Sequence, residues 1–302
     1  MTARDIALAL TVVSIWDFNF VVIRIGLDDL PPILFAALRF ALAAVPAVFF
    51  LRPPKAPARL VVLYGLFMFA AQFALLFTGL YLGMPAGLAS LVLQLHVFIT
   101  IGLAALVLRE KTHPLQIAGA ALAACGLGLV AMNTGGEMRA TGLVLVVLAA
   151  CSWAVANLVS KRIGQVDILS LVAWGSLVAP LPLLVLSFVL EGPARYAIAV
   201  ETLSWSAIGS LAYIVYPTTL LGFSIWSSLL SRYPAASVAP FTLLVPVVGF
   251  LSAAFVLGEA LEMWKLAAAM LVVAGLCVNL LGPRSLPLLR RWRGRKARPS
   301  AP

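Results

Sequence analysis

The chain has 302 residues, of which 63% are hydrophobic and 11% are charged. Water-soluble domains are usually about 45–50% apolar and about 25% charged. This composition excludes a water-soluble fold and predicts a chain whose apolar side chains face lipid. The net charge of +10 could indicate a nucleic-acid partner, but seven of the positive residues lie in the C-terminal tail. Such a tail after a membrane helix indicates contact with anionic lipid, so we expect no nucleic-acid partner.

Ten apolar stretches reach the length of about 20 residues that a helix needs to cross a bilayer. We therefore expect an all-α polytopic membrane protein with ten transmembrane helices and no separate soluble domain. A short interfacial segment is expected within 191–205, with Tyr196 and Trp205 near the headgroups. The spans are predicted at 5–27, 32–51, 60–81, 86–108, 113–132, 140–160, 167–190, 206–230, 235–257 and 262–281.

The first two spans each carry a charged side chain, Asp17 in span 1 and Arg39 in span 2. A charge at the middle of the bilayer costs at least about 2.5–3.5 kcal/mol, so it needs a partner or water. Two interpretations of Asp17 have equal weight. It is either a cavity carboxylate that attracts a substrate ammonium group or carries a proton, or it forms a structural ion pair with Arg39.

Spans 3 and 4 carry the polar residues Gln72, Gln94 and His96. On a regular helix Gln94 and His96 cannot share one face, so at most one of them points straight at a cavity. His96 is a candidate proton site, or a lone hydrogen-bonded histidine. No second histidine lies near it and the three cysteines are far apart, so we expect no metal and no cofactor.

Aromatic side chains recur in spans 1, 3, 6, 7 and 8. They are candidates for the wall of an amphipathic cavity, and equally for packing or for the aromatic belt at the interface. Trp153, Trp174 and Tyr213 fall deep inside their spans, which favours the cavity. Trp16 and Phe77 complete the set of aromatic cavity candidates.

The two halves of the chain resemble each other. The polar run around Asn19 recurs 138 residues later around Asn157, and the end of span 4 at Glu110 recurs 149 residues later at Glu259. Each half holds five spans, so the second half enters the bilayer from the opposite side. Inverted repeats around a central cavity are a signature of transporters. The domains expected are the first repeat (1–132), the inverted second repeat (139–282) and a basic cytoplasmic tail (283–302).

The duplication bears on the roles of the paired polar residues. Asn19 and Asn157 either hold spans 1 and 6 together by hydrogen bonds between the helices, or contact the substrate at the pseudo-twofold axis. Glu110 and Glu259 are expected at the interfaces. There, capping or gate contacts suit them better than catalysis.

Several motifs, in consistent order over about residues 5–281, resemble one known family. Trp16-Asp17-Phe18-Asn19 resembles the family's Trp-Gly-x-Asn opening, and Leu38-Arg39-Phe40 resembles its Leu-Arg-Phe element. The residues at the starts and ends of spans 4 and 9 also resemble the pattern of this family. This is the EamA family of the drug/metabolite transporter superfamily. Within it, the chain looks most like bacterial exporters of amino acids and their derivatives, such as O-acetylserine, cysteine and aromatic amino acids. Asp17 departs from the pattern, since the family has a small glycine there.

The resemblance and the repeats together imply a secondary transporter that exports amino acids or related small amphipathic metabolites by alternating access. Exporters of sugars, nucleobases or cationic compounds remain the alternative, and a membrane enzyme is less favoured because the sequence lacks a nucleophile or metal motif. Most lysines and arginines fall in the loops on the side of the termini. Both termini are therefore expected in the cytoplasm, with the protein in the bacterial inner membrane. The expected partners are a small-molecule substrate and membrane lipid, and a monomer suffices for function.

Overall fold

The computed structural model describes residues 1–133 and 138–296. Ten helices or helix runs within these residues are long and apolar enough to cross a bilayer, which confirms the ten predicted spans to within a few residues. The first half consists of α1 (Ala3–Gly26), α2 (Pro32–Phe50), α3 (Ala58–Gly65) continued by η1 (Leu66–Ala71) and α4 (Gln72–Tyr81), α5 (Ala86–Leu93) followed by α6 (Leu95–Leu108), and α7 (Pro114–Met132).

The second half repeats this plan. It consists of α8 (Ala140–Ile163), α9 (Ile168–Val178) with α10 (Pro180–Leu190), α12 (Trp205–Tyr213) continued by η2 (Ile214–Leu221) and α13 (Gly222–Arg232), α14 (Ala235–Val238) and η3 (Ala239–Leu244) leading into α15 (Val245–Leu257), and α16 (Met263–Lys296). The short helix α11 (Pro193–Glu201) lies within the segment 191–205 that was expected at the interface. Helix α16 continues through most of the basic tail to Lys296, and residues 297–302 of that tail lie outside the described residues.

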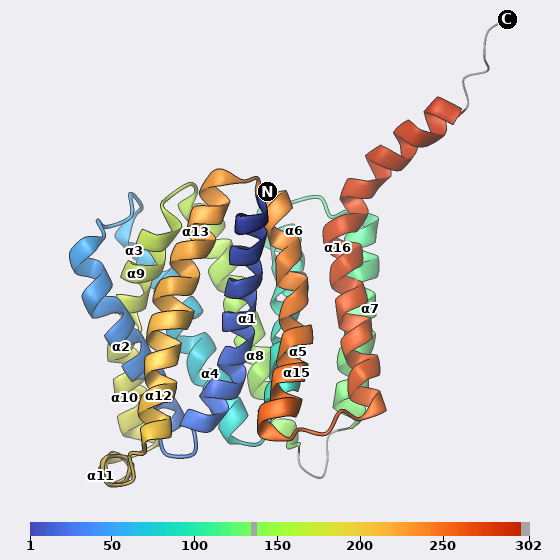
Figure 1. The fold of residues 1–302 in the computed structure, drawn as a ribbon. Helices are drawn as coiled ribbons and strands as arrows, with labels where there is room; N and C mark the ends of the chain where they lie inside the picture. The colour runs from blue at the N-terminus through green and yellow to red at the C-terminus, as the bar shows by residue number, and fades with distance from the viewer. Residues whose placement is uncertain (134–137, 297–302) are drawn as a thin grey trace, which may run out of the picture.

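Helix α1 begins, and α16 ends, at the same end of the molecule, which we call the terminal end (Figure 1). The turns at 27–31, 82–85 and 258–262 lie at the opposite end, which we call the distal end. Several helices start at a side chain that accepts a hydrogen bond from the first turn, which satisfies an otherwise unpaired backbone N–H. These capping residues are Thr2, His113, Asp167 and Ser204.

Local irregularities occur at equivalent places in the two halves. Spans 3 and 8 both widen to π-helical turns in their middle, at η1 and η2. Spans 4 and 9 are both interrupted before their longest helix, at Gln94 and at η3. Both of these spans then end on a left-handed residue, Arg109 with φ of 55° and Gly258 with φ of 68°. Since each half has five spans, these shared features make the halves inverted structural repeats, as predicted.

Helices α7 and α16 stand together at one edge of the molecule (Figure 1). Glycines allow their backbones to touch, because a Cβ placed on Gly275 would lie 2.5 Å from the carbonyl oxygen of Gly119. Small residues at such contacts are the usual way in which helices pack inside a membrane. This pair closes one side of the bundle.

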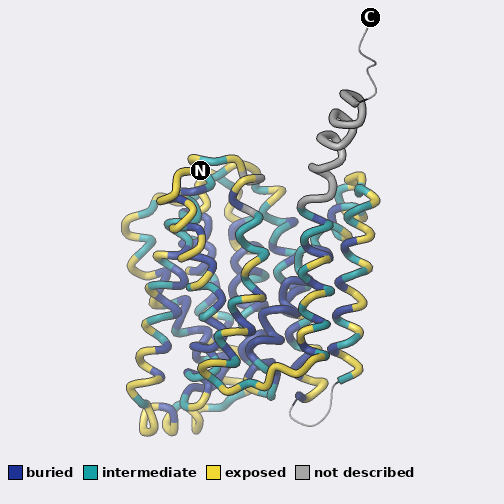
Figure 2. Tube along the Cα trace, turned by 45° about the vertical axis from the view of Figure 1, so that its right-hand side comes forward, coloured by how far each residue is buried: buried dark blue, intermediate teal, exposed yellow. Residues whose placement is uncertain are grey.

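Buried residues follow the inner faces of the helices, and exposed residues follow the outer faces (Figure 2). Large apolar side chains such as Phe49, Phe50, Leu106 and Phe255 are at least 80% exposed on those outer faces. In water this apolar surface would be unfavourable, whereas in a bilayer it meets lipid chains. The exposure pattern therefore agrees with a multi-pass membrane protein.

Candidate functional site

A central cavity of about 400 Å³ lies between the two repeats. Its wall is formed by residues of α1, α2, η1 with α4, and α5 with α6 from the first half, and by residues of α8, α9, η2 with α13, η3 with α15, and α16 from the second. Most of the wall is aromatic or aliphatic. The polar side chains in the wall are Asn19, Arg39, Gln72, Ser90, Gln94, His96, Thr218 and Thr242.

The cavity is blocked toward the distal end and extends toward the terminal end. Phe35 and Phe77 are fully buried between the cavity and the distal turns, with ring centroids 5.3 Å apart, and Leu80 is buried one turn further on. On the other side, the cavity wall includes Ile168 at the start of α9 and Leu230 near the end of α13. A ligand would therefore enter this cavity from the terminal end.

Six of the residues proposed from the sequence as cavity residues lie in its wall: Trp16, Asn19, Gln72, Gln94, His96 and Trp153. Gln94 and His96 both line it, which is compatible with the expectation that one points straight at the cavity and the other flanks it. Span 4 is interrupted at Gln94, between α5 and α6. His96 stacks on Trp153 with ring centroids 3.9 Å apart and planes inclined by 11°.

Asp17 does not line the cavity and is not paired with Arg39, so the ion-pair interpretation is wrong. The side chain of Asp17 is fully buried, and neither carboxylate oxygen has a hydrogen-bond partner. It points to the contact of α1 with α5 and α15, where a Cβ on Gly249 would lie 2.6 Å from Asp17 Oδ1 and 2.5 Å from Ser90 Oγ. Arg39 is held instead by Thr219 of η2.

Asn157 also lies outside the cavity wall. Its side-chain amide donates to Thr100 Oγ1 of α6 at 3.0 Å, and Asn19 Oδ1 has no hydrogen-bond partner. The proposed pairing of Asn19 with Asn157 is therefore wrong. The two residues are equivalent in sequence, yet only Asn19 contributes to the cavity.

Three aromatic candidates serve packing in this structure and do not line the cavity. Phe77 packs on Phe35 in the distal block. The indole N–H of Trp174 donates to the carbonyl of Leu51 at 3.0 Å, and the hydroxyl of Tyr213 donates to the carbonyl of Ile15 at 3.2 Å. Depth within a span gave no information about which way these rings face.

Carboxylates from the second repeat cap two helices of the first repeat at the distal end. Glu259 accepts hydrogen bonds from the backbone N–H of Ala86 at 2.6 Å and of Gly87 at 3.2 Å, at the start of α5. Glu191 accepts from the N–H of Ile33 at 2.7 Å and of Leu34 at 3.1 Å, at the start of α2. Both contacts place a negative charge at the positive end of a helix dipole and hold the distal end together.

The terminal end is bridged by different contacts. Asp5 of α1 accepts from Arg232 at 2.8 Å and from the hydroxyl of Tyr233 at 2.7 Å. Glu110, the repeat equivalent of Glu259, forms an exposed ion pair with Lys161 at 2.7 Å. Exposed ion pairs contribute about 0–1 kcal/mol. Apart from the part-buried Asp5 contact, the terminal end thus has the weaker connections between the repeats.

Several residues of the site were missed in the sequence. Thr218 and Thr219 lie in the π-helical segment η2, beside Pro217, and Phe73 follows Gln72 in α4. The backbone carbonyl of Thr218 accepts a hydrogen bond from the indole N–H of Trp16 at 3.0 Å, which holds Thr218 at the cavity wall. The proline within span 8 was the available signal for an irregular, polar-lined segment here.

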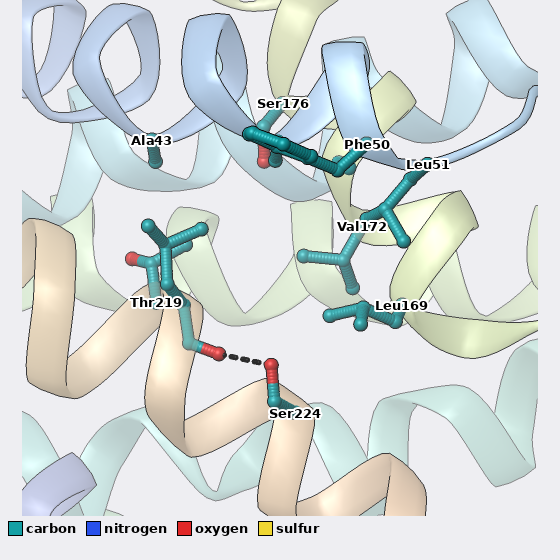
Figure 3. Close-up of a pocket in the computed structure, with 11 residues that line it drawn as sticks. Ala43, Phe50, Leu51, Leu169, Val172, Ser176, Thr219 and Ser224 are labelled. Carbon is teal, nitrogen blue, oxygen red and sulfur yellow. Dashed lines mark hydrogen bonds between the residues drawn. The ribbon is translucent and has the colours of Figure 1, made fainter.

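A second, smaller hollow of about 230 Å³ lies between α2, α9, η2 and the start of α13. Figure 3 shows side chains of these elements around it, with Ala43 and Phe50 from α2, Val172 and Ser176 from α9, and Thr219 from η2. Its lining is mostly apolar, and the hydroxyl of Ser224 is already bonded to the carbonyl of Leu220 at 2.6 Å. Thr219 separates this hollow from Arg39 and the central cavity.

Comparisons with known proteins agree with this geometry. Residues 4–132 and 140–281 each match the EamA-like transporter family. The chain is 46% identical over 290 residues to a protein of Salmonella typhimurium (strain LT2) named probable amino-acid metabolite efflux pump, covering 94% of this chain and 97% of that protein. It is 43% identical, with the same coverage, to an Escherichia coli (strain K12) protein of the same name.

A solved crystal structure superposes on 93% of this chain and 97% of its own, with a TM-score of 0.65. At 20% sequence identity this likeness concerns the fold alone.

Proposed function

Because the chain belongs to the EamA-like transporter family, we propose that it exports amino-acid metabolites across the bacterial inner membrane, with the central cavity as the substrate path. The names of the two relatives above, each similar over 94% of the chain, support this substrate class. The observation that carries the proposal is a cavity of about 400 Å³ built by both inverted repeats. A shared central site is what alternating access requires.

The cavity suits a small amphipathic solute. Aromatic rings such as Trp16, Phe73 and Trp153 offer apolar surface, and polar side chains such as Asn19 and Gln72 sit among them. Small-molecule sites commonly combine a mainly apolar wall with a few convergent polar groups. A single chain contains the whole cavity, so one copy suffices for transport, and no metal or other cofactor is invoked.

The direction of transport follows from orientation. The positive-inside rule predicts that both termini lie in the cytoplasm. The cavity extends toward the terminal end, so the described conformation would load substrate from the cytoplasm. Rearrangement of the distal contacts of Glu191 and Glu259 and closure of the terminal end would then release it on the other side.

Counterflow in proteoliposomes tests the proposal. Purified protein is reconstituted with a high internal concentration of one unlabelled amino acid, and uptake of the labelled form is followed with and without an imposed pH gradient. We expect transient, saturable accumulation that other amino acids compete with, and none in protein-free liposomes. Non-saturable flux would indicate a pore, and a chemically altered product without flux would indicate an enzyme, and either result overturns the proposal.

A further inference from the structure

Arg39 is a buried positive charge with no acidic partner. Its side chain is 2% exposed, and none of the ion pairs found within residues 1–133 and 138–296 includes it. Nε and Nη2 both donate to the same atom, Thr219 Oγ1, at 3.3 and 3.2 Å. Nη1 has no hydrogen-bond partner. The guanidinium group is therefore positioned but only partly satisfied.

Aromatic rings surround the group without replacing a counter-ion. The guanidinium carbon lies 4.5 Å from the ring centroid of Phe73 and 5.3 Å from that of Phe40. Such contacts stabilise a cation in a dry site to a limited extent. A buried charge is normally paired and fully hydrogen-bonded, so the Arg39 side chain lacks a partner that an anionic group would supply.

Arg39 is the only side chain with a permanent charge in the described wall of the central cavity. Asp17, the acid that the sequence suggested as its ion-pair partner, lies outside this wall. The wall therefore presents one positive charge and no negative one. The planar guanidinium is the side chain best matched to a carboxylate, because it can donate two parallel hydrogen bonds.

The same wall contains acceptors that lack partners. Asn19 Oδ1, Gln72 Oε1 and Thr218 Oγ1 are buried without a hydrogen bond. A donor such as an ammonium group would satisfy one of these oxygens once its side chain turned toward the cavity. The cavity thus combines a cation for a carboxylate, unpartnered acceptors for an ammonium group and an aromatic wall for a side chain. These are the three parts of an amino acid.

We propose that Arg39 binds the carboxylate of the transported solute, with Thr219 as a positioning residue that orients the guanidinium group. This inference rests on the proposed function and deepens it by naming what the site selects. The solute carries a free carboxylate, and an amide, an ester or a decarboxylated amine of the same compound binds poorly. Amino acids and N-acylated amino acids fulfil the condition, whereas organic cations do not.

The test compares matched competitors in the counterflow assay. For the amino acid that is transported best, we measure inhibition by the unlabelled acid, by its amide and by its decarboxylated amine. With the wild-type protein, the amide and the amine should inhibit at least about tenfold more weakly than the acid, because the cationic site repels them and one hydrogen-bonded pair is lost. Equal inhibition by acid and amide overturns the proposal.

Variants separate binding from a structural role of Arg39. In Arg39→Gln the acid should bind at least about tenfold more weakly while the amide binds no more weakly than to the wild type, so that the acid-to-amide ratio approaches one. Arg39→Lys keeps the charge without the paired geometry and should retain an intermediate ratio. Met132→Leu, a change at an exposed residue outside the cavity wall, is the control and should keep the wild-type ratio. A wild-type ratio in Arg39→Gln contradicts the proposal.

The two proposals fail differently. If no amino acid is transported, the proposed function itself fails, and this inference fails with it. If amino acids are transported and the acid has no advantage over the amide, only the role of Arg39 is refuted. Should Arg39→Gln not fold, the wild-type competition and Arg39→Lys still decide the question.

Discussion

The distal cap made by Glu259 should contribute measurably to stability. Helix α5 begins after Pro85 and has no capping side chain of its own. The carboxylate of Glu259 accepts its first two N–H groups at 2.6 and 3.2 Å. Hydrogen bonds to a charged acceptor contribute about 1.5–3 kcal/mol, and the helix dipole adds about 0.3–1 kcal/mol. We expect Glu259→Ala to lower the free energy of unfolding by about 2–3 kcal/mol, and Glu259→Gln by about half as much.

The assay is thermal or SDS-induced unfolding of the purified protein in detergent. Glu262→Gln is the matched control, because Glu262 lies in the same turn but its ion pair with Lys265 is long, at 3.5 Å, and half-exposed. Such a pair contributes about 0–1 kcal/mol. If Glu259→Ala is no less stable than Glu262→Gln, the capping argument is refuted.

The cap should also influence the conformational equilibrium, since it joins the repeats only at the distal end. If the cap stabilises only the distally closed state, losing about 2–3 kcal/mol of that stabilisation would lower the ratio of closed to open molecules by about 30- to 150-fold. Labelling of a cavity residue from the distal side, measured on intact cells, would report this change.

Three further predictions concern packing and backbone geometry. Gly275→Ala should lower the free energy of unfolding by about 1–3 kcal/mol, because the new Cβ would lie 2.5 Å from a backbone carbonyl oxygen. Gly128→Ala is the control and should leave stability unchanged, because no atom lies within 4 Å of its Cβ. Thermal unfolding of the two variants measures the difference. Trp153→Ala should raise the half-saturating substrate concentration about 2- to 10-fold by removing the stack on His96, and an unchanged value would exclude that stack from the site. Arg109→Gly should raise stability by about 1 kcal/mol, because its φ of 55° favours glycine; a loss of stability would contradict this.

Most of the architecture was predictable because hydropathy and helix length are strong signals in a membrane. The ten spans follow from apolar stretches of fixed length, and the inverted arrangement follows from an odd number of spans in each half. The segment 191–205 was predicted as interfacial and contains α11. These features depend on composition along the chain, which a single sequence provides directly.

The placement of individual side chains was predictable only in part. Sequence position gives the depth of a residue in the bilayer but not the direction in which it faces, so Trp174 and Tyr213 were assigned to a cavity they do not line. Gln94 and His96 were proposed for the cavity as the polar residues of span 4, and both line it. Asp17 and Arg39 lie on neighbouring spans yet face different helices.

Long-range contacts between the repeats gave no signal in the sequence. Glu191 caps α2 across more than 150 positions of the chain, and its role depends on the packing of α10 beside α2. Glu259 was expected at an interface with a capping or gate role, but its partner helix could not be named. The role of Thr219 could not be predicted either, because it depends on the hydrogen bonds that Thr219 accepts from Arg39.

The central claim is that the cavity between the repeats is the substrate path and opens alternately to the two sides. Val97→Cys, in a background in which Cys125, Cys151 and Cys277 are replaced by serine, places one thiol in its wall. The account predicts labelling by a membrane-impermeant thiol reagent from the terminal side, protection by saturating substrate, and labelling from the distal side only during turnover. A thiol that no reagent reaches from either side, or whose labelling substrate leaves unchanged, would contradict it.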